Sequence, residues 1–361
     1  MALAAGIVGL PNVGKSTIFN AISSGKAESN NYPFCTIEPN VGRVGVPDER
    51  LGRIQKLIPT QRVIPASIEI VDIAGLVKGA SQGAGLGNKF LGHIREVDAV
   101  LHVVRCFEDG DITHVSGKVD PVSDIETVEL ELIFADMDSV EKRLQRMGKM
   151  TDADSKKEIA ALKKAQTLLA DGHWLERCEW SEDERLALKP LCLLSMKPVL
   201  YVANVHENDL EGKSPHVATV RDHAQKVGEG IVVISGKIEA ELAALDPEEA
   251  EAFLADLGLK ESGLAALARE TYRLLGLQSY FTAGVKEIRA WTIEAGTKAP
   301  GAAGVIHSDF EKGFIRAEVF TLADLEQCGS ETEIRNQGKL RLEGKEYVVQ
   351  DGDIMHFRFN V

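Results

Sequence analysis

One short segment near the start of the chain limits the possible folds more than any other feature. Gly9-Leu-Pro-Asn-Val-Gly-Lys-Ser16 matches all eight positions of a phosphate-binding loop (P-loop). An apolar run, Leu3–Val8, precedes it, and a helical segment, Thr17–Ile22, follows it. Glycines let such a loop wrap around an anion, and N–H groups at the helix N-terminus point at the phosphate oxygens. We expect Lys15 to bridge the β- and γ-phosphates as a catalytic residue and Ser16 to offer its hydroxyl to Mg²⁺.

The first part of the chain alternates short apolar runs with helical segments. The runs are rich in Val and Ile, which is typical of strands buried on both faces of a parallel sheet. We therefore expect an α/β fold, in which a P-loop G domain has a mostly parallel, doubly wound sheet. The expected strands are Leu3–Val8, Val41–Val46, Ser67–Val71, Ala99–Val104, Val199–Ala203 and Gly230–Ser235.

Two further segments are typical of a Mg²⁺-nucleotide site. Asp72-Ile-Ala-Gly75 follows an expected strand, so its carboxylate can hold Mg²⁺ through water and the Gly75 N–H can reach the γ-phosphate. Thr36 lies in a loop between this segment and the P-loop, where it can complete the Mg²⁺ shell. We predict that Ser16, Thr36 and Asp72 bind the metal, a combination typical of G-domain proteins.

The expected base site departs from the GTPase pattern. Asn204-Val-His-Glu207 follows a late strand, where GTPases of this class carry Asn-Lys-x-Asp. The lysine is absent and the carboxylate is one methylene longer, so the paired donors of guanine no longer meet it at the right depth. Backbone groups around Val205 can instead satisfy adenine, which favours ATP over GTP. Ser235 and Gly236, after another strand, are similar to the last base-contacting loop of the class. The predicted base-site residues are Asn204, Val205, Glu207, Ser235 and Gly236.

The position after Asp-x-x-Gly is Leu76, where Ras-like enzymes carry a glutamine that orients the attacking water. Leucine can neither orient water nor transfer a proton, so another group must assist hydrolysis. His114, in a loop, and His93 are the two candidates; a structural role for each imidazole is the alternative.

From Ile125 to Met196 the chain is polar, charged and helical. Apolar residues at alternating spacings of three and four predict the seam of a coiled coil or helical hairpin. Between Lys142 and Lys164 there are eight basic and three acidic residues, which form either a solvated helix face or a patch that binds RNA phosphates. The seam residues are Leu130, Ile133, Met137, Val140, Leu144 and Met147, and the basic residues are Lys142, Arg143, Arg146, Lys149, Lys156, Lys157, Lys163 and Lys164.

After Gln278 the pattern predicts a small α+β domain. Its expected strands are Arg289–Ile293, Phe314–Phe320, Glu346–Gln350 and Met355–Val361. The predicted organisation is therefore 1–124 and 197–277 for the two parts of the G domain, 125–196 for the inserted helical coiled coil, and 278–361 for the C-terminal domain.

Composition excludes several classes of protein. The five cysteines are scattered and include no Cys-x-x-Cys, which favours the reduced thiols of a cytoplasmic protein over a disulfide framework or zinc site. No apolar run is long enough to span a membrane, and the apolar N-terminus lacks the basic start of a signal peptide. The net charge of −14 makes the chain a poor non-specific binder of nucleic acid, so no DNA partner is expected.

In combination, the motifs resemble those of the YchF and Obg-like ATPase family over essentially the whole chain. The matching segments include Gly9–Thr17, Asn31–Asn40, Asp72–Ala80, Gly85–Asn88, His102–Glu108, His114–Lys118, Asn204–Glu207, Tyr280–Glu287, Asp309–Arg316 and Asp351–Val361. The resemblance implies a G domain with an inserted coiled coil and a C-terminal TGS domain of β-grasp fold. It also implies ATP hydrolysis in association with the ribosome.

The same resemblance assigns residues to roles. It implies that phosphate and Mg²⁺ contacts fall on Thr36 and on the P-loop residues Asn12, Val13, Gly14, Lys15, Ser16 and Thr17, that adenine is contacted at Val205, and that His114 is the catalytic imidazole. Asn12 also stands where potassium-stimulated G-domain proteins help to bind K⁺. Two other interpretations stay open: a nucleotide-gated RNA or ribosome binding module with negligible catalysis, and a GTPase.

Overall fold

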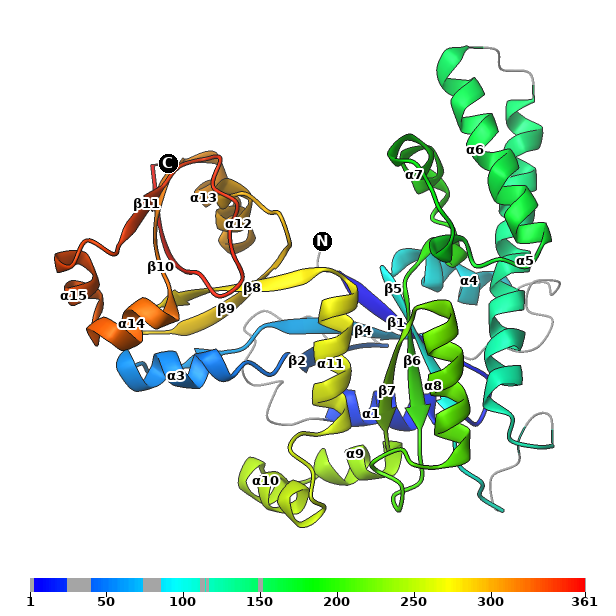
Figure 1. Cartoon of the computed structure of the whole chain (residues 1–361), viewed down its shortest axis with the longest axis horizontal. Helices are drawn as coiled ribbons and strands as arrows, with labels where there is room; N and C mark the ends of the chain where they lie inside the picture. The colour runs from blue at the N-terminus through cyan, green and yellow to red at the C-terminus, as the bar shows by residue number, and fades with distance from the viewer. Residues whose placement is uncertain are drawn as a thin grey trace. The chain divides into compact units, whose positions relative to one another are not determined.

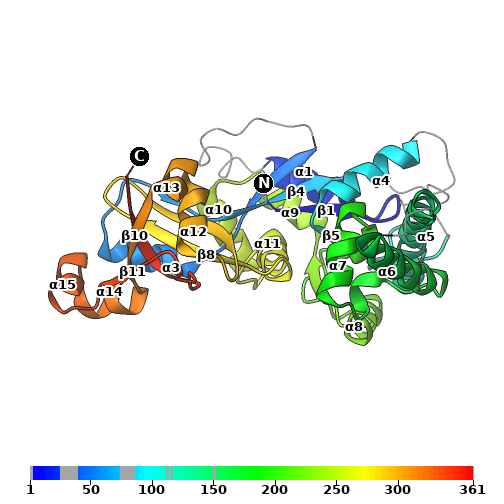
Figure 2. The same ribbon diagram turned by 90° about the horizontal axis from the view of Figure 1, so that it is seen from above.

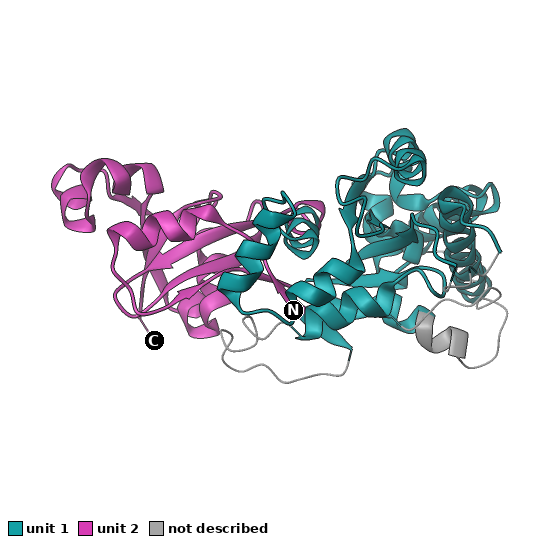
Figure 3. Ribbon diagram, turned by 90° about the horizontal axis from the view of Figure 1, so that it is seen from below, with its two compact units in different colours: residues 1–26, 37–42, 69–270 teal, residues 27–36, 43–68, 271–361 magenta. Residues whose placement is uncertain are grey.

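The computed structural model describes residues 3–24, 40–73, 86–110, 114, 117–148 and 152–360, without the side chains of 86–90 and 153. The chain divides into two compact units, teal and magenta in Figure 3. The second unit combines residues 43–68 with 271–361, and residues 69–270 belong to the first. This division differs from our predicted boundaries, because 43–68 was expected in the G domain and 125–196 does not form a compact unit of its own.

A six-stranded sheet in the order β2-β4-β1-β5-β6-β7 has most of its residues in the first unit (Figure 1). β1 pairs in parallel with β4 and β5, β5 with β6, and β6 with β7. Every residue of β5 and β6 is buried, which explains their continuous apolar sequences. The strands are β1 Ala4–Val8, β2 Val41–Gly45, β4 Ser67–Asp72, β5 Ala99–Arg105, β6 Val199–Asn204 and β7 Gly230–Ile234, which confirms the α/β fold and all six predicted strands.

Helices follow the strands of this sheet. α1 begins at Lys15, within the P-loop, and α9 begins at Gly236, one residue after the end of β7. Helix starts carry side-chain caps, such as Ser214 at the start of α8, whose hydroxyl accepts from Val217 N–H. The helices are α1 Lys15–Ser24, α4 Leu86–Glu96, α5 Pro121–Met147, α6 Ala153–Ala170, α7 Glu182–Leu188, α8 Pro215–Val227, α9 Gly236–Leu242, α10 Pro247–Asp256 and α11 Gly263–Leu274, with short 3₁₀ turns η1 Leu175–Arg177, η2 Lys189–Leu191 and η3 Leu194–Met196.

The helical insert is a hairpin in which α5 and α6 pack side by side (Figures 1 and 2). Ile133, Val140 and Met147 of the predicted seam are buried, but Leu130 is 44% exposed, so the predicted seam is wrong at that end. The reason is that the first half of α5 packs on the G-domain sheet and buries a different face, including Ile125 and Val128. A capping box is present at the start of α7, between Ser181 and Glu184.

The second unit holds a second six-stranded sheet, in the order β11-β10-β12-β8-β9-β3. β3 pairs in parallel with β9, and on α3 Arg50 forms an ion pair with Asp351 at 2.7 Å, which explains why residues 43–68 belong here. Its elements are α3 Glu49–Leu57, β3 Val63–Ile64, β8 Leu277–Ala283, β9 Ile288–Glu294, α12 Ala299–Ile306, α13 Ser308–Lys312, β10 Phe314–Phe320, α14 Leu322–Cys328, α15 Glu331–Asn336, β11 Arg341–Glu343 and β12 Ile354–Phe359.

One predicted strand of this unit is wrong. Residues 346–350 contain only an isolated bridge between Lys298 and Val348. Their backbone groups bond to a turn instead: Ala299 N–H donates to Tyr347 carbonyl oxygen and Val349 N–H to Thr297 carbonyl oxygen. The core of the sheet lies around Tyr280, whose hydroxyl donates to Ala302 carbonyl oxygen on α12. None of the described helices has both the length and the apolar sequence needed to cross a membrane.

Candidate functional site

The P-loop has the backbone geometry that its glycines predicted. Gly9 and Gly14 have positive φ angles of 152° and 98°, and Asn12 is left-handed at 62°. A Cβ atom on Gly14 would lie 2.1 Å from Asn204 Nδ2, and one on Gly9 would lie 2.5 Å from Val103 carbonyl oxygen. Both positions therefore require glycine for close approach as well as for the turn.

Lys15 is buried at the start of α1, and the next two residues, Ser16 and Thr17, are exposed. Its ammonium donates to the carbonyl oxygens of Gly9 and Leu10, at 2.9 and 2.6 Å. Burial lowers the pKa of Lys15 to about 8, and the nearby Asp72 carboxylate partly offsets this. An anion in the loop would favour the charged ammonium, so this lysine is prepared for a phosphate group.

Asp72 ends β4 beside the P-loop strand, with its Cα in register with Ile7. Burial raises the pKa of its carboxyl group, and the Lys15 charge lowers it again. Mg²⁺ commonly takes one or two protein oxygens together with phosphate oxygens and water. The Asp72 carboxylate and the exposed Ser16 hydroxyl fit that pattern, and no cluster of three or more His, Cys, Asp or Glu side chains that could hold a metal occurs in the described residues. The predicted Thr36 and Gly75, and Leu76, lie outside the described residues.

Asn204 joins the P-loop to the loop that follows β7. Its side chain is buried; Nδ2 donates to Val13 carbonyl oxygen at 2.9 Å, and Oδ1 accepts from Gly236 N–H at 3.0 Å. Both ends of the amide are therefore bonded to backbone groups that are far apart in the sequence. Asn204 thus joins the phosphate and base loops, and the nucleotide contact that we expected of it stays a prediction.

The other predicted base-site residues gather at the same edge of the sheet. Val205 N–H donates to Ile234 carbonyl oxygen at 2.8 Å, which extends the β6–β7 pairing. Glu207 forms an ion pair with Lys237, which holds the pKa of that carboxyl below its usual range. Among the described residues, Ser235 Oγ is the buried side-chain polar atom without a hydrogen-bond partner.

The two candidate catalytic histidines have different surroundings. His93 is exposed on α4. His114 is buried, and its Nε2 lies 2.9 Å from Asp124 Oδ2 in the first turn of α5. Burial raises the pKa of the Asp124 carboxyl, and the adjacent imidazole opposes that rise. An imidazole held by a carboxylate has a fixed orientation, which is the usual arrangement for a group that must present its other nitrogen.

Three residues of the site were not found from the sequence. Asp124 could not be recognised as the partner of His114, because acidic residues are ordinary in the first turn of a helix. Lys237 stands beside predicted base-loop residues, but nothing in the sequence linked it to Glu207. Arg105 is buried at the end of β5 and donates to the carbonyl oxygens of Phe107 and Asp109, so it fixes the chain that leads towards His114.

Two family models match parts of the chain. Residues 4–164 match the family model described as a 50S ribosome-binding GTPase, and residues 277–360 match the YchF C-terminal model, described as a protein of unknown function. A ribosome-binding ATPase YchF from Bacillus subtilis is 54% identical over the whole of both chains. The chain belongs to the YchF family. The protein of the same name from Escherichia coli O157:H7 is 50% identical, again over both full lengths.

A solved YchF structure supports the fold as well as the family. The Schizosaccharomyces pombe YchF GTPase is 40% identical, with a TM-score of 0.89 over 99% of this chain and 97% of that one. The names of the relatives differ in the nucleotide, since the bacterial proteins are called ATPases and the yeast protein a GTPase. The nucleotide that this chain prefers therefore depends on the residues of its own base site.

Proposed function

We propose that the chain is a ribosome-associated ATPase that hydrolyses Mg²⁺-bound ATP to ADP and phosphate and acts as a nucleotide-controlled switch. The observation that carries the proposal is the pair of hydrogen bonds from the Asn204 amide, which join the P-loop to the loop after β7. The segment that follows Asn204 lacks the Lys-x-Asp residues with which GTPases recognise guanine. The names of the bacterial relatives, at 50 to 54% identity over full length, support both the nucleotide and the ribosome.

In this proposal the P-loop residues bind the phosphates and Lys15 stabilises the charge that develops on the transferring phosphoryl group. Ser16 and Asp72, with Thr36, would hold Mg²⁺, which would neutralise phosphate charge when bound. The Gly75 N–H contacts the γ-phosphate, so loss of that group on hydrolysis releases the loop and switches the protein.

The preference for ATP follows from polar groups of the base site that are already hydrogen-bonded or ion-paired within the protein. Because Val205 N–H is bonded to Ile234, the backbone group that this residue can offer a base is its carbonyl oxygen, an acceptor. An acceptor suits the N6 amino group of adenine and repels O6 of guanine. The Glu207 carboxylate is bonded to Lys237 and would have to leave it to read guanine. Ser235 Oγ supplies a further polar group to the base site.

His114 is the proposed catalytic imidazole, oriented by Asp124, because Leu76 cannot orient water. K⁺ beside Asn12 would add positive charge near the phosphates, in the manner of an arginine finger. A ribosome-associated protein of this kind works in the cytoplasm, and its partners there would be ribosomal RNA and ribosomal proteins.

The test is a titration of ATP and GTP, with and without ribosomes, on the wild type and on Lys15→Ala. We expect tighter binding of ATP than of GTP, ribosome-stimulated multiple turnover of ATP, and no hydrolysis by Lys15→Ala. Lys260→Ala, which removes an exposed lysine of the same unit, is the matched control and should behave as wild type. Tighter GTP binding would favour the GTPase alternative, and binding to ribosomes without turnover would favour a nucleotide-gated binding module.

A further inference from the structure

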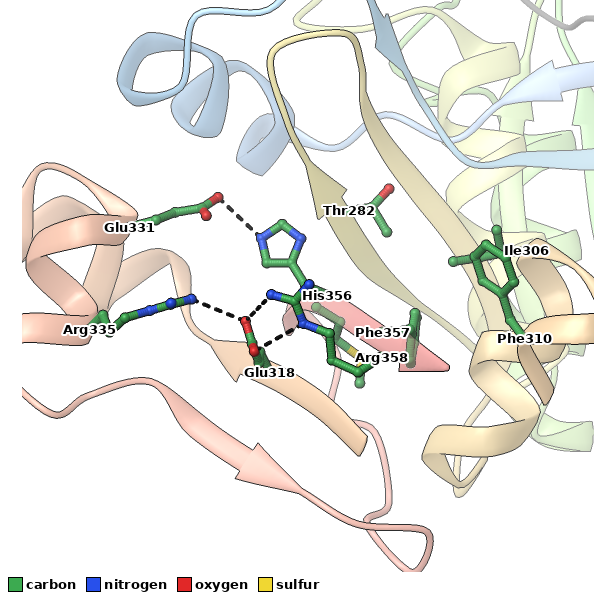
Figure 4. A pocket seen from close by; sticks show the side chains of 10 residues that line it. Thr282, Ile306, Phe310, Glu318, Glu331, Arg335, His356, Phe357 and Arg358 are labelled. Carbon is green, nitrogen blue, oxygen red and sulfur yellow. Dashed lines mark hydrogen bonds and ion pairs between the residues drawn. The ribbon is translucent and has the colours of Figure 1, made fainter. Parts of the chain in front are cut away.

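Two grooves outside the nucleotide site differ in charge. The groove in the second unit, of about 360 Å³, is lined by two arginines and a histidine whose charges are compensated within it (Figure 4). Glu318 accepts from Arg358 at 3.1 Å and from Arg335 at 3.2 Å, and His356 lies 3.2 Å from Glu331. Such a groove has no charge left for a ligand. The groove in the first unit is different.

This second groove, of about 580 Å³, lies between α4, α5 and the turn η2. α4 and α5 are neighbours in both views of the molecule (Figures 1 and 2). Four cationic side chains and one carboxylate line it: Arg95 from α4, and Lys142, Arg143, Arg146 and Asp138 from α5. In a chain of net charge −14, this local excess of positive charge identifies an anion-binding surface.

The cations are arranged along one wall. Ser139, Lys142 and Arg146 are spaced by three and four residues, so they share one face of α5. Arg95 crosses from α4 and donates to Ser139 Oγ at 2.7 Å, which uses one of its five N–H donors. Lys142 is bonded to Asp138 at 2.6 Å, but both side chains are more than 60% exposed, so solvent screens the pair.

Arg146 is the most available of the four. It is exposed, and among the described residues it has no acidic partner within ion-pair distance. Arg143 is paired with Glu158 on α6 at 2.7 Å, as Lys157 is with Asp183 at 3.5 Å and Lys164 with Glu184 at 3.0 Å. Arg146 therefore carries the most available charge of the groove, and Lys156 and Lys163, exposed on α6, likewise have no ion pair among the described residues.

At the base of the groove, a ligand can approach the backbone of α4 closely. A Cβ atom on Gly92, in the middle of α4, would meet no other atom within 4 Å. Glycine costs a helix interior about 1 kcal/mol relative to alanine. The groove also has an apolar part, formed by Leu91, Ala135, Pro190 and Leu191. An open groove with guanidinium groups along one wall fits the phosphates of a polymer better than a single small molecule, and arginine forks match phosphate oxygens.

We propose that the groove between α4 and α5, with Arg95, Lys142, Arg143 and Arg146, binds the phosphate backbone of RNA. The proposal rests on the ribosome association proposed above and names the surface that serves it. It also replaces the expectation that the lysines Lys156, Lys157, Lys163 and Lys164 make the main contact. Because Arg95 belongs to α4 and the other three cations to α5, bound RNA would hold the two helices together.

The test compares two groove variants with a control of equal charge change. Lys142→Glu with Arg146→Glu reverses two groove cations, and Gly92→Leu fills the groove without any change in charge. Lys156→Glu with Lys163→Glu is the control, since both lysines are exposed on α6 and neither lines the groove. Binding is measured by anisotropy of a labelled 16-base-pair RNA duplex over a salt series and by co-sedimentation with purified ribosomes. Basal ATP hydrolysis checks that each variant is folded.

We expect both groove variants to bind the duplex and the ribosome at least about tenfold more weakly, with basal hydrolysis unchanged and the control close to wild type. The double reversal should also reduce the slope of log affinity against log salt by about two, one for each lost phosphate contact. If wild type binds ribosomes and the groove variants bind equally well, the groove proposal is wrong and the proposed function stands. If wild type binds neither ribosomes nor the duplex, both fail. Tighter groove-dependent binding of polyglutamate than of RNA would assign the groove to an acidic protein and overturn the proposal.

Discussion

The variant Asn204→Ala tests whether Asn204 holds the two loops around the nucleotide in position or contacts the base directly. The substitution removes two buried hydrogen bonds, from Nδ2 to Val13 carbonyl oxygen and from Gly236 N–H to Oδ1. Each buried backbone group that loses its partner costs about 1–3 kcal/mol. For the two groups together the cost is therefore roughly 2–6 kcal/mol.

This loss acts on nucleotide affinity because the P-loop and the base loop must be held together to bind one molecule. Since about 1.4 kcal/mol is tenfold in an equilibrium constant, the affinities for ATP and GTP should both fall by roughly 30-fold or more. The ratio between them should not change, because the amide contacts only backbone groups of the protein.

Calorimetry with ATP, GTP and ADP measures these affinities, and thermal unfolding without nucleotide measures the part of the loss that falls on stability. Asn204→Asp is the matched variant, since it keeps the acceptor for Gly236 N–H and replaces the donor to Val13 by a repelling oxygen. It should lose affinity for all three nucleotides and keep their ratio. A change of more than about threefold in the ATP-to-GTP ratio, in either variant, would mean that Asn204 reads the base and would refute the reasoning.

Three further outcomes are expected. The affinity for ATP should fall by roughly tenfold between pH 7 and 9. The reason is that bound phosphates keep Lys15 charged, whereas its pKa of about 8 lets the nucleotide-free protein lose that proton over this range. Adenosine, measured by the same calorimetry, should show no such fall. Asp124→Asn should lower kcat by roughly 10²-fold and change the pH–rate profile while leaving ATP affinity intact, and an unchanged profile would remove His114 from catalysis. K⁺ should raise turnover above that in Na⁺ for wild type but not for Asn12→Gly, which tolerates the same positive φ; equal rates for wild type in the two salts would exclude a K⁺ site.

The strands of the first sheet could be predicted because their signal is local. Each is a short apolar run, and the strands buried on both faces, such as β5 and β6, need no alternation to be recognised. The P-loop was equally accessible, since its glycines and the flanking strand and helix are consecutive in the sequence. Ends of elements were displaced by a residue or two, as expected when a strand end depends on its neighbour.

Long-range pairing could not be predicted from the same patterns. The assignment of residues 43–68 to the second unit depends on β3 pairing with β9 and on Arg50 bonding to Asp351, about three hundred residues later. Residues 346–350 have the apolar pattern of a strand, but their backbone bonds go to the turn before α12. In both cases the partner decides the structure, and the segment itself carries no signal for it.

The same limit applies at Asn204, whose hydrogen bonds to two distant backbone segments carry no local sequence signal. A motif indicates which side chains gather at the edge of a sheet, but it does not indicate which of them are already bonded to the protein. Asn204 uses both ends of its amide on backbone groups, and Glu207 is paired with Lys237. The groups that remain for a base are those that the protein has not already paired, and Ser235 Oγ is the clearest of them among the described residues. We therefore expect selectivity at this site to follow from the polar groups that remain unpaired after folding. On this reasoning, a departure of two residues from the guanine motif can change the preferred nucleotide while the phosphate loop is unaltered.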